Sequence, residues 1–319
     1  MPPQSVTLRI SAKTALRRLR WQIGYKLKRR LDALVGWIIG PLFRLTRRFD
    51  RVWLSNFVGA LMRNVGPWLP EHRTGQKNLA AAFPDKSAAE IEAILAGVWD
   101  NLGRVSAEFV SLDRICAGEP WRYPNIERSA VAIERSLRLR DDGKPALVFG
   151  AHLANWELPP VIAESDGIDF MVLYRRPSMG SVANAIVKLR ANVMGTIVAA
   201  GFDAPIRLAR GLEQGRHVGI LVDQHDARGI PVTFFGRRCL VNPLIAVLAR
   251  QIECPIHGVR VIRLPDGRFA AEISEELQPA RNAEGRIDVA GTMQAITTVV
   301  EGWVREHPEQ WLWLHRRWR

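Results

Sequence analysis

The chain has 319 residues, 47% hydrophobic and 24% charged, a composition that is typical of a folded globular protein and excludes disordered, collagen-like and coiled-coil classes. The net charge is +13 and is unevenly distributed, because residues 1–51 hold 13 Lys and Arg against Asp32 and Asp50, a net charge of +11. A nearly neutral body with a basic front end indicates attachment to an anionic surface.

The pattern of the front end favours a membrane surface over a nucleic acid. Between residues 16 and 31, leucine or isoleucine recurs every three or four positions, and Lys and Arg fill the gaps. This pattern is typical of a basic amphipathic helix in a membrane interface. A nucleic-acid binder is expected to mix its basic residues with polar, base-reading ones. The alternative is a basic helix that packs on its own domain and leaves its charged face in water.

Two uncharged runs follow, at residues 33–43 and 52–62, and each is shorter than the roughly 20 residues that a membrane span needs. Pro41 also interrupts the first run. We therefore expect residues 1–71 to form a membrane-associated helical segment, a hairpin lying in the interface. A true span with charged ends at the two surfaces is the alternative.

Residues 72–319 are expected to form one α/β domain. Residues 70–85 have the character of a linker, and a capping box at Ser87–Glu90 then begins a helix with a 3.6-residue apolar period. From residue 145, short apolar runs alternate with helical stretches, which predicts a mostly parallel sheet flanked by helices on both faces. The expected strands are 146–150, 170–174, 196–199 and 218–222, the expected helices are 157–165, 181–193, 204–214 and 288–306, and a hairpin joins 256–264 to 268–277.

The exit of the first of these strands carries a histidine and a carboxylate. His152 follows the strand directly, and Glu157 stands five residues later at the start of the next helix, for which Asn155 is the expected N-cap. Such a carboxylate can hold the imidazole in one tautomer and stabilise the imidazolium that forms when the other nitrogen takes a proton. The spacing alone also fits a structural loop histidine and a carboxylate at a helix N-terminus.

A second polar cluster, Asp-Gln-His-Asp at residues 223–226, follows the strand at 218–222. Three potential ligands within four residues make a metal-dependent hydrolase that uses His152, Asp223 and His225 the alternative function. The sequence holds no HExxH motif, and its three cysteines form no CxxC pair, so we expect no metal. Asp223 is then expected to fix a loop or to contact substrate.

Short motifs are spread over the chain from about residue 50 onward. They are Asn78-Leu79 with Phe83-Pro84, His152 to Glu157, Tyr174-Arg175-Arg176-Pro177, Asp223-Gln224, Val232 to Gly236 and Pro308 to Trp318. Together they resemble the late (secondary) acyltransferases of lipid A biosynthesis, within the glycerolipid and lysophospholipid acyltransferase superfamily. A glutamate at position 157 is more similar to the lipid A branch than to the glycerol-phosphate branch.

The resemblance implies a role for each site residue. In similar enzymes the histidine of the His-x4-(Asp/Glu) motif is the general base, which implies that His152 takes a proton from the acceptor hydroxyl while Glu157 orients it. The resulting oxyanion needs positive groups. Arg175 or Arg176 either supplies them or binds an acceptor phosphate, and which of the two faces the site stays open. The residues expected to bind substrate are Arg175, Arg176, Arg190, Asn155 and Asp223.

The resemblance also implies the partners of a membrane-bound O-acyltransferase. The donor is an acyl carrier protein or coenzyme A thioester, and the acceptor is a hydroxyl on a 3-hydroxyacyl chain of a phosphorylated glucosamine lipid. No cofactor and no metal are implied. The expected location is the bacterial inner membrane, with the catalytic domain on the cytoplasmic side. A lysophospholipid or ornithine-lipid acyltransferase would use the same residues, and a non-enzymatic membrane or nucleic-acid binding protein is a third hypothesis.

Overall fold

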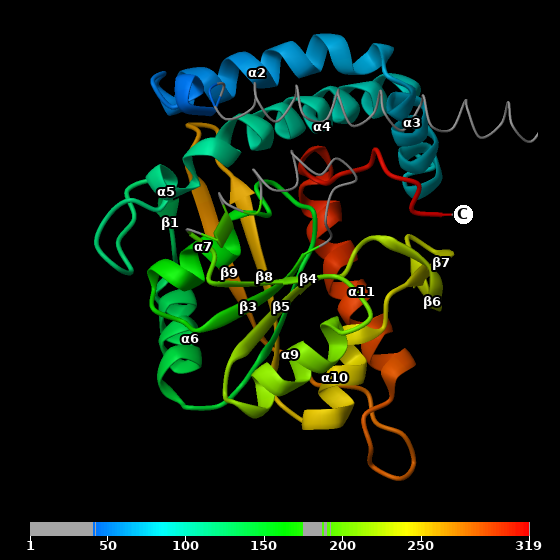
Figure 1. Cartoon of the computed structure of the whole chain (residues 1–319). Helices are drawn as coiled ribbons and strands as arrows, with labels where there is room; N and C mark the ends of the chain where they lie inside the picture. Colours follow the sequence, from blue (N-terminus) through cyan, green and yellow to red (C-terminus); the bar gives the residue numbers. More distant parts are fainter. Residues whose placement is uncertain (1–40, 42, 175–186, 188–189, 192, 319) are drawn as a thin grey trace, which may run out of the picture.

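The computed structural model describes residues 43–174 and 193–318, together with residues 41, 187, 190 and 191. The strands of its main sheet are β1 (Ile126–Glu127), β2 (Leu147–Gly150), β3 (Phe170–Tyr174), β4 (Thr196–Ala199), β5 (His217–Leu221), β8 (Ile256–Arg263) and β9 (Phe269–Glu276). They lie in the order β1-β9-β8-β2-β5-β3-β4 (Figure 1). Strands β8, β2, β5, β3 and β4 are parallel, and β9 runs antiparallel to β8. The predicted α/β class with a mostly parallel sheet is confirmed.

Helices cover both faces of this sheet, so all four residues of β2 are buried. Side chains alternate between the faces along the strand. Phe149 stacks on Trp303 with ring centroids 5.6 Å apart, while its neighbour Val148 lies on the other side with Ile162. The helices are α6 (Ala130–Asp141) and α7 (Leu158–Ser165) on one face, and α9 (Ala204–Glu213), α10 (Leu244–Ile252) and α11 (Val289–Glu306) on the other.

Helices α2 (Arg51–Val65), α3 (Pro70–Ala82) and α4 (Ala88–Glu108) form a further layer across one end of the sheet (Figure 1). Ser87 and Glu90 cap α4 reciprocally, as the sequence predicts. Helices α2 and α4 pack closely, because a Cβ atom on Gly103 would lie 2.5 Å from the carbonyl oxygen of Val58. A glycine is therefore required at this contact.

The linker expected at residues 70–85 is wrong, because Pro70–Ala82 form helix α3. Proline is compatible with this first position, where its missing N–H would have no helical partner. The buried face of α3 consists mainly of small and polar side chains, so it shows little apolar periodicity in the sequence. These residues are His72, Gly75, Asn78, Leu79 and Ala82.

The other predicted ranges that fall on described residues agree closely with β2 to β5, the β8–β9 hairpin, α7, α9 and α11. Helices α5 (Leu112–Ile115), α6 and α10 and strand β1 have no counterpart among the predicted ranges. The structure adds an antiparallel pair, β6 (His225–Phe234) and β7 (Arg237–Val241), which packs beside α11. The helix expected at 181–193 lies mostly outside the described residues, as does the basic helix expected at 16–31. Within the described ranges, no helix combines the length and apolar character needed to cross a membrane.

Candidate active site

The exits of β2 and β5 bring a histidine and an aspartate together. These strands are parallel neighbours, in which Gly150 pairs with Leu221. His152 and Asp223 each stand two residues beyond this pair, so the two strands place them side by side at the same edge of the sheet. His152 Nδ1 lies 2.7 Å from Asp223 Oδ1.

Three hydrogen-bond donors hold the Asp223 side chain, which is fully buried. Besides the imidazole, the backbone N–H of His152 and Trp311 Nε1 both donate to Oδ2 at 2.7 Å. Burial by itself would raise the pKa of Asp223, but the charge of His152 and these hydrogen bonds outweigh burial and lower it. Asp223 is therefore ionised beside the ring.

This carboxylate fixes the tautomer of His152. Because a carboxylate only accepts hydrogen bonds, Nδ1 carries a proton. Nε2 lies 3.2 Å from Gln224 Nε2, an amide nitrogen that only donates, so the neutral ring presents a lone pair there. Burial lowers the pKa of His152, whereas the charge and hydrogen bond of Asp223, with a smaller effect from the charge of Glu157, raise it, and the net shift is upward. Nε2 is thus placed to take a proton from a group that replaces the Gln224 amide.

The loop after β2 contains a left-handed residue, Ala154, with a φ of +45°. Residues other than glycine rarely adopt this conformation, and it persists where neighbouring contacts hold it. The N–H of Ala154 donates to the carbonyl of Gln310 at 2.9 Å, and its own carbonyl accepts from Asn101 Nδ2 at 3.1 Å. Helix α4 and the C-terminal segment, residues 310–318, therefore hold the loop from two sides.

Glu157 binds Arg190 and not His152, which corrects the predicted hydrogen bond between the two motif residues. Arg190 Nε donates to Glu157 Oε2 at 2.8 Å, and Nη2 donates to Oε1. The guanidinium also lies over the rings of Tyr174, at 4.4 Å, and Phe109, at 5.4 Å. Its Nη1 is buried and has no hydrogen-bond partner among the described residues. The strand order explains the difference, because it supplies His152 with a carboxylate from β5.

A buried polar network centred on Glu108, at the end of α4, lies behind the loop. Arg263 makes two hydrogen bonds to its carboxylate, at 2.5 and 2.9 Å, and Ser55 donates to it at 2.7 Å. Asn155 Nδ2 also donates to Glu108, at 2.9 Å, and this asparagine is fully buried. Asn155 is not the N-cap that the sequence predicts, because α7 begins only at Leu158.

The remaining predicted site residues are Arg175, Arg176 and the residues of the alternative metal site. Arg175 and Arg176 lie outside the described residues, so their contacts stay predictions. His225 begins β6, and the Asp223 oxygens already accept three hydrogen bonds. In the part of the chain that the structure describes, no three His, Cys, Asp or Glu side chains are grouped to hold a metal ion. This geometry does not favour the hydrolase hypothesis based on His152, Asp223 and His225.

Trp311 is the site residue that sequence reasoning missed, although it lies within a quoted motif. The available signal is the density of tryptophan near the end of the chain. Trp311 and Trp313 are completely buried and pack edge to face, with ring centroids 4.6 Å apart. The packing fixes the Trp311 ring so that its N–H meets Asp223.

Comparison with protein-family models gives one finding about the chain as a whole. The model of the bacterial lipid A biosynthesis acyltransferases matches residues 25–319. The comparison with curated proteins gives no match. The matched range contains His152, Glu157, Asp223 and the C-terminal segment, so the geometry described above falls within it.

Proposed function

Because the chain belongs to the bacterial lipid A biosynthesis acyltransferases, and is therefore an acyltransferase of lipid A acylation, we propose that it acylates a hydroxyl of a lipid A precursor. The acceptor hydroxyl lies on a 3-hydroxyacyl chain of a phosphorylated glucosamine lipid, and the donor is an acyl thioester. The observation that carries this proposal is the His152–Asp223 pair, which leaves Nε2 of a neutral imidazole available as a base.

The reaction then proceeds through one tetrahedral intermediate. The acceptor hydroxyl replaces the Gln224 amide at His152 Nε2, which takes the proton as the oxygen attacks the thioester carbonyl carbon. A C–O bond forms, and the carbonyl π electrons move to the oxygen. When the intermediate collapses, the C–S bond breaks and the imidazolium returns its proton to the leaving thiolate. Asp223 stabilises the imidazolium between the two steps.

Arg190 is the proposed source of positive charge for the oxyanion. It lies close enough to His152 for its charge to lower the pKa of the imidazole. Glu157 holds two of its nitrogens, which leaves the buried Nη1 to donate to a developing negative charge. Glu157 is thus a positioning residue in this proposal, while Arg175 or Arg176 binds an acceptor phosphate.

Mass spectrometry of lipid A from cells with and without the gene tests the proposed function. Loss of one secondary acyl chain is expected, restored by the parent gene and not by His152→Ala. Unchanged lipid A would reject it. Acyl transfer by the purified enzyme to a lysophospholipid or an ornithine lipid, and not to a glucosamine lipid, would favour those alternative acceptors. Assays with acyl carrier protein and coenzyme A thioesters identify the donor.

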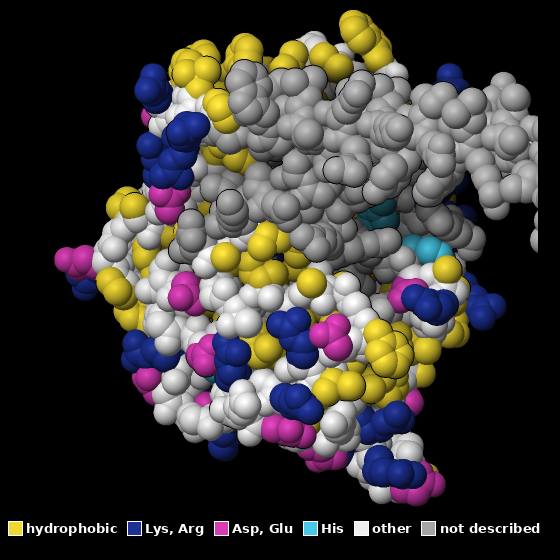
Figure 2. All heavy atoms as spheres, viewed as in Figure 1, with side chains coloured by type: hydrophobic (Ala, Val, Ile, Leu, Met, Phe, Trp, Pro, Cys, Tyr) yellow, Lys and Arg dark blue, Asp and Glu magenta, His cyan; other side chains and the backbone are white. Residues whose placement is uncertain are grey.

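We propose that the protein is located at the cytoplasmic face of the inner membrane. Besides the basic residues 1–51, support comes from a row of exposed apolar side chains at every fourth position from residue 45 to residue 61. We name this row the interfacial stripe. Rings within it stack, with centroids 5.5 and 5.4 Å apart, and hydrophobic side chains gather along the top of the molecule in Figure 2, where α2 lies. Exposed aromatic rings beside basic residues are typical of membrane interfaces. The stripe consists of Leu45, Phe49, Trp53, Phe57 and Leu61, each 44–54% exposed.

Replacing two aromatic residues of the stripe, Trp53→Ser with Phe57→Ser, is expected to weaken binding to anionic vesicles by about tenfold or more, because the helix loses apolar area that enters the interface. Vesicle sedimentation of the full chain measures this. The control is Phe202→Ser with Ile206→Ser, which removes two side chains near the start of α9 that are at least as exposed, at 100% and 54%, and is expected to leave binding unchanged. If both double variants lost vesicle binding to the same extent, the interfacial stripe would not be the membrane-binding surface.

A further inference from the structure

Arg317 is a buried arginine for which the described residues supply no acidic partner. It is 1% exposed, and its Nε and Nη1 are buried with no hydrogen-bond acceptor among the described residues. By contrast, the deeply buried Arg128 and Arg263 pair with Asp166 and Glu108, at 2.6 and 2.5 Å. A guanidinium keeps its charge inside proteins, and burying it unpaired is unfavourable. Arg317 therefore has hydrogen-bonding capacity that the described protein groups do not use.

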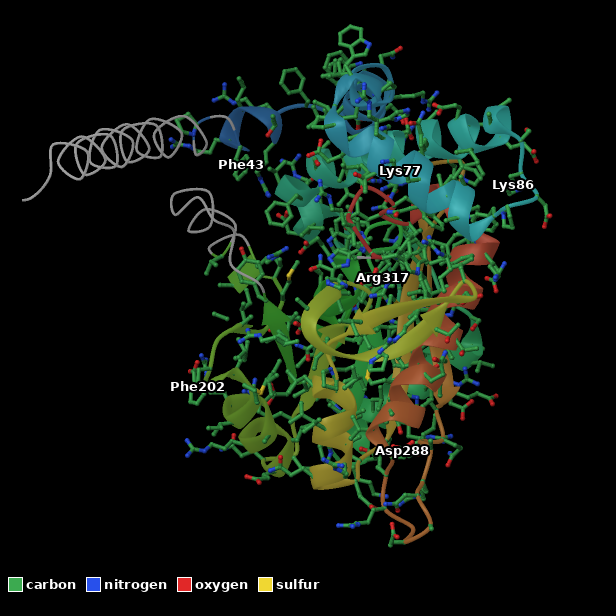
Figure 3. The ribbon with its side chains drawn as sticks, turned by 90° about the vertical axis from the view of Figure 1, so that its right-hand side faces the viewer. Phe43, Lys77, Lys86, Phe202, Asp288 and Arg317 are labelled. Atoms are coloured by element: carbon green, nitrogen blue, oxygen red, sulfur yellow. The ribbon has the colours of Figure 1, made fainter. Side chains whose placement is uncertain are left out.

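A second unused donor lies beside Arg317. The guanidinium carbon of Arg317 is 5.0 Å from the centre of the Phe234 ring, and Trp318 stacks on the same ring with centroids 5.8 Å apart. Trp318 Nε1 is buried and likewise has no acceptor in the described ranges. In Figure 3, Arg317 lies inside the molecule, between α3 and the β6–β7 hairpin. Two donor side chains without acceptors thus share one aromatic neighbour.

The charges around these donors favour an anion. Arg237 lies over the Trp318 ring at 5.0 Å. Arg305 lies over the neighbouring Phe235 ring at 4.3 Å, but Glu301 pairs with this arginine at 2.7 Å. Arg237 is therefore the cation that adds to Arg317. Burial lowers the pKa of Arg317, and the negative charge of Asp223 acts against this shift. The Asp223 oxygens, however, already accept hydrogen bonds from three other donors. An anionic group with several acceptor oxygens would satisfy the unused donors, and a phosphoryl group has this chemistry.

We propose that Arg317 and Trp318 bind a phosphoryl group of one of the two substrates. The inference rests on the proposed function, in which the pantetheine arm of the donor and the glucosamine of the acceptor both carry phosphate. The centre of the Phe234 ring lies 5.0 Å from the Arg317 guanidinium carbon and 5.5 Å from the Trp311 ring, and Trp311 donates to Asp223. A phosphoryl group at Arg317 is therefore connected to Asp223 through the Phe234 and Trp311 side chains, and it fixes the substrate relative to the reacting groups.

Thermal unfolding of the full chain in inorganic phosphate, against chloride of equal ionic strength, tests the binding step. Phosphate is expected to raise the melting temperature of the parent and of Arg316→Met, whose side chain is exposed. Arg317→Met removes a buried charge but keeps an apolar side chain, so it is expected to fold and to lose most of this shift. Arg317→Lys should retain part of it. Equal shifts in Arg317→Met and the parent, or no shift in the parent, overturn the proposal.

Steady-state kinetics identify the substrate that carries the phosphate. Arg317→Met is expected to raise one substrate's KM about tenfold to a hundredfold, with little change in kcat, because it loses charge-assisted hydrogen bonds. Donors with and without the pantetheine phosphate, and acceptors with and without sugar phosphates, form the two arms. If removing the phosphate from one substrate abolishes the rise in KM that Arg317→Met causes, that substrate supplies the phosphoryl group. A rise in KM that persists in both arms without phosphate overturns the proposal. Phosphate binding through Arg317 in a chain that transfers no acyl group would reject the proposed function alone.

Discussion

Asp223→Asn is expected to lower kcat by about 10³–10⁴-fold while changing the KM of either substrate far less. Asparagine has nearly the size of aspartate, so the loop keeps its shape. Its neutral amide, however, no longer holds the proton on His152 Nδ1, and it cannot stabilise the imidazolium. Steady-state kinetics with saturating acyl thioester measure the effect.

The pH profile of kcat/KM separates this explanation from a general loss of folding. The neutral imidazole is the base, so the parent rate rises as the pH passes upward through the pKa of His152, which Asp223 raises. Without that carboxylate the pKa falls, and the acid limb of the profile is expected to move to lower pH. The matched control is Asp226→Asn, which removes a carboxylate bonded to Asn242 and should leave the limb in place. An unmoved limb in Asp223→Asn would contradict direct pairing.

Breaking the Glu157–Arg190 pair is expected to cost about 10²–10³-fold in kcat/KM, the effect typical of losing one oxyanion donor. Glu157→Gln removes the charge that orients the guanidinium, and Arg190→Met removes the guanidinium itself. Because both substitutions act through the same donor, Arg190 Nη1, the double variant is expected to lose little more kcat/KM than Arg190→Met alone. Single-turnover acyl transfer is measured for the parent, the two single variants and the double variant, which together form a double-mutant cycle.

An ion pair far from the site gives the control for this cycle. Arg216 and Asp169 also form several hydrogen bonds, but the Asp169 side chain is 66% exposed. Asp169→Asn is therefore expected to leave kcat/KM almost unchanged. The pH profile again distinguishes the roles, because the charge of Glu157 raises the pKa of His152 less than Asp223 does, so Glu157→Gln should move the acid limb less than Asp223→Asn. A shift as large as that of Asp223→Asn would mean that Glu157 orients His152 directly.

Local patterns are sufficient for much of the fold. Strands β3 and β4 are short apolar runs that match their predicted ranges, and α4 combines a capping box with a clear 3.6-residue period. Helix α3 escapes the same reasoning because its buried face contains histidine, glycine and asparagine. Hydrophobic patterning detects faces that exclude water, and it fails where small or hydrogen-bonded polar side chains form the contact.

The partner of His152 could not be predicted for a different reason. The exits of both strands are visible in the sequence, but their adjacency depends on the order β2-β5-β3-β4, in which β5 inserts beside β2. Chain-adjacent strands are neighbours in most sheets, and Glu157 is close to His152 in the chain. Sequence reasoning therefore favours Glu157. Pairing order is a property of the whole sheet, and no local spacing encodes it.

The C-terminal segment couples the reacting groups to the cooperative unfolding of the domain. Trp311 donates to Asp223, Leu312 donates to the carbonyl of His152, and Asn78 donates to the carbonyl of Trp313. These hydrogen bonds join parts of the chain that are far apart in sequence, so no single element can open and release them one at a time. The amide hydrogens of His152 and Leu312 are thus expected to exchange only with global unfolding, and heat should abolish activity and tertiary structure in one transition.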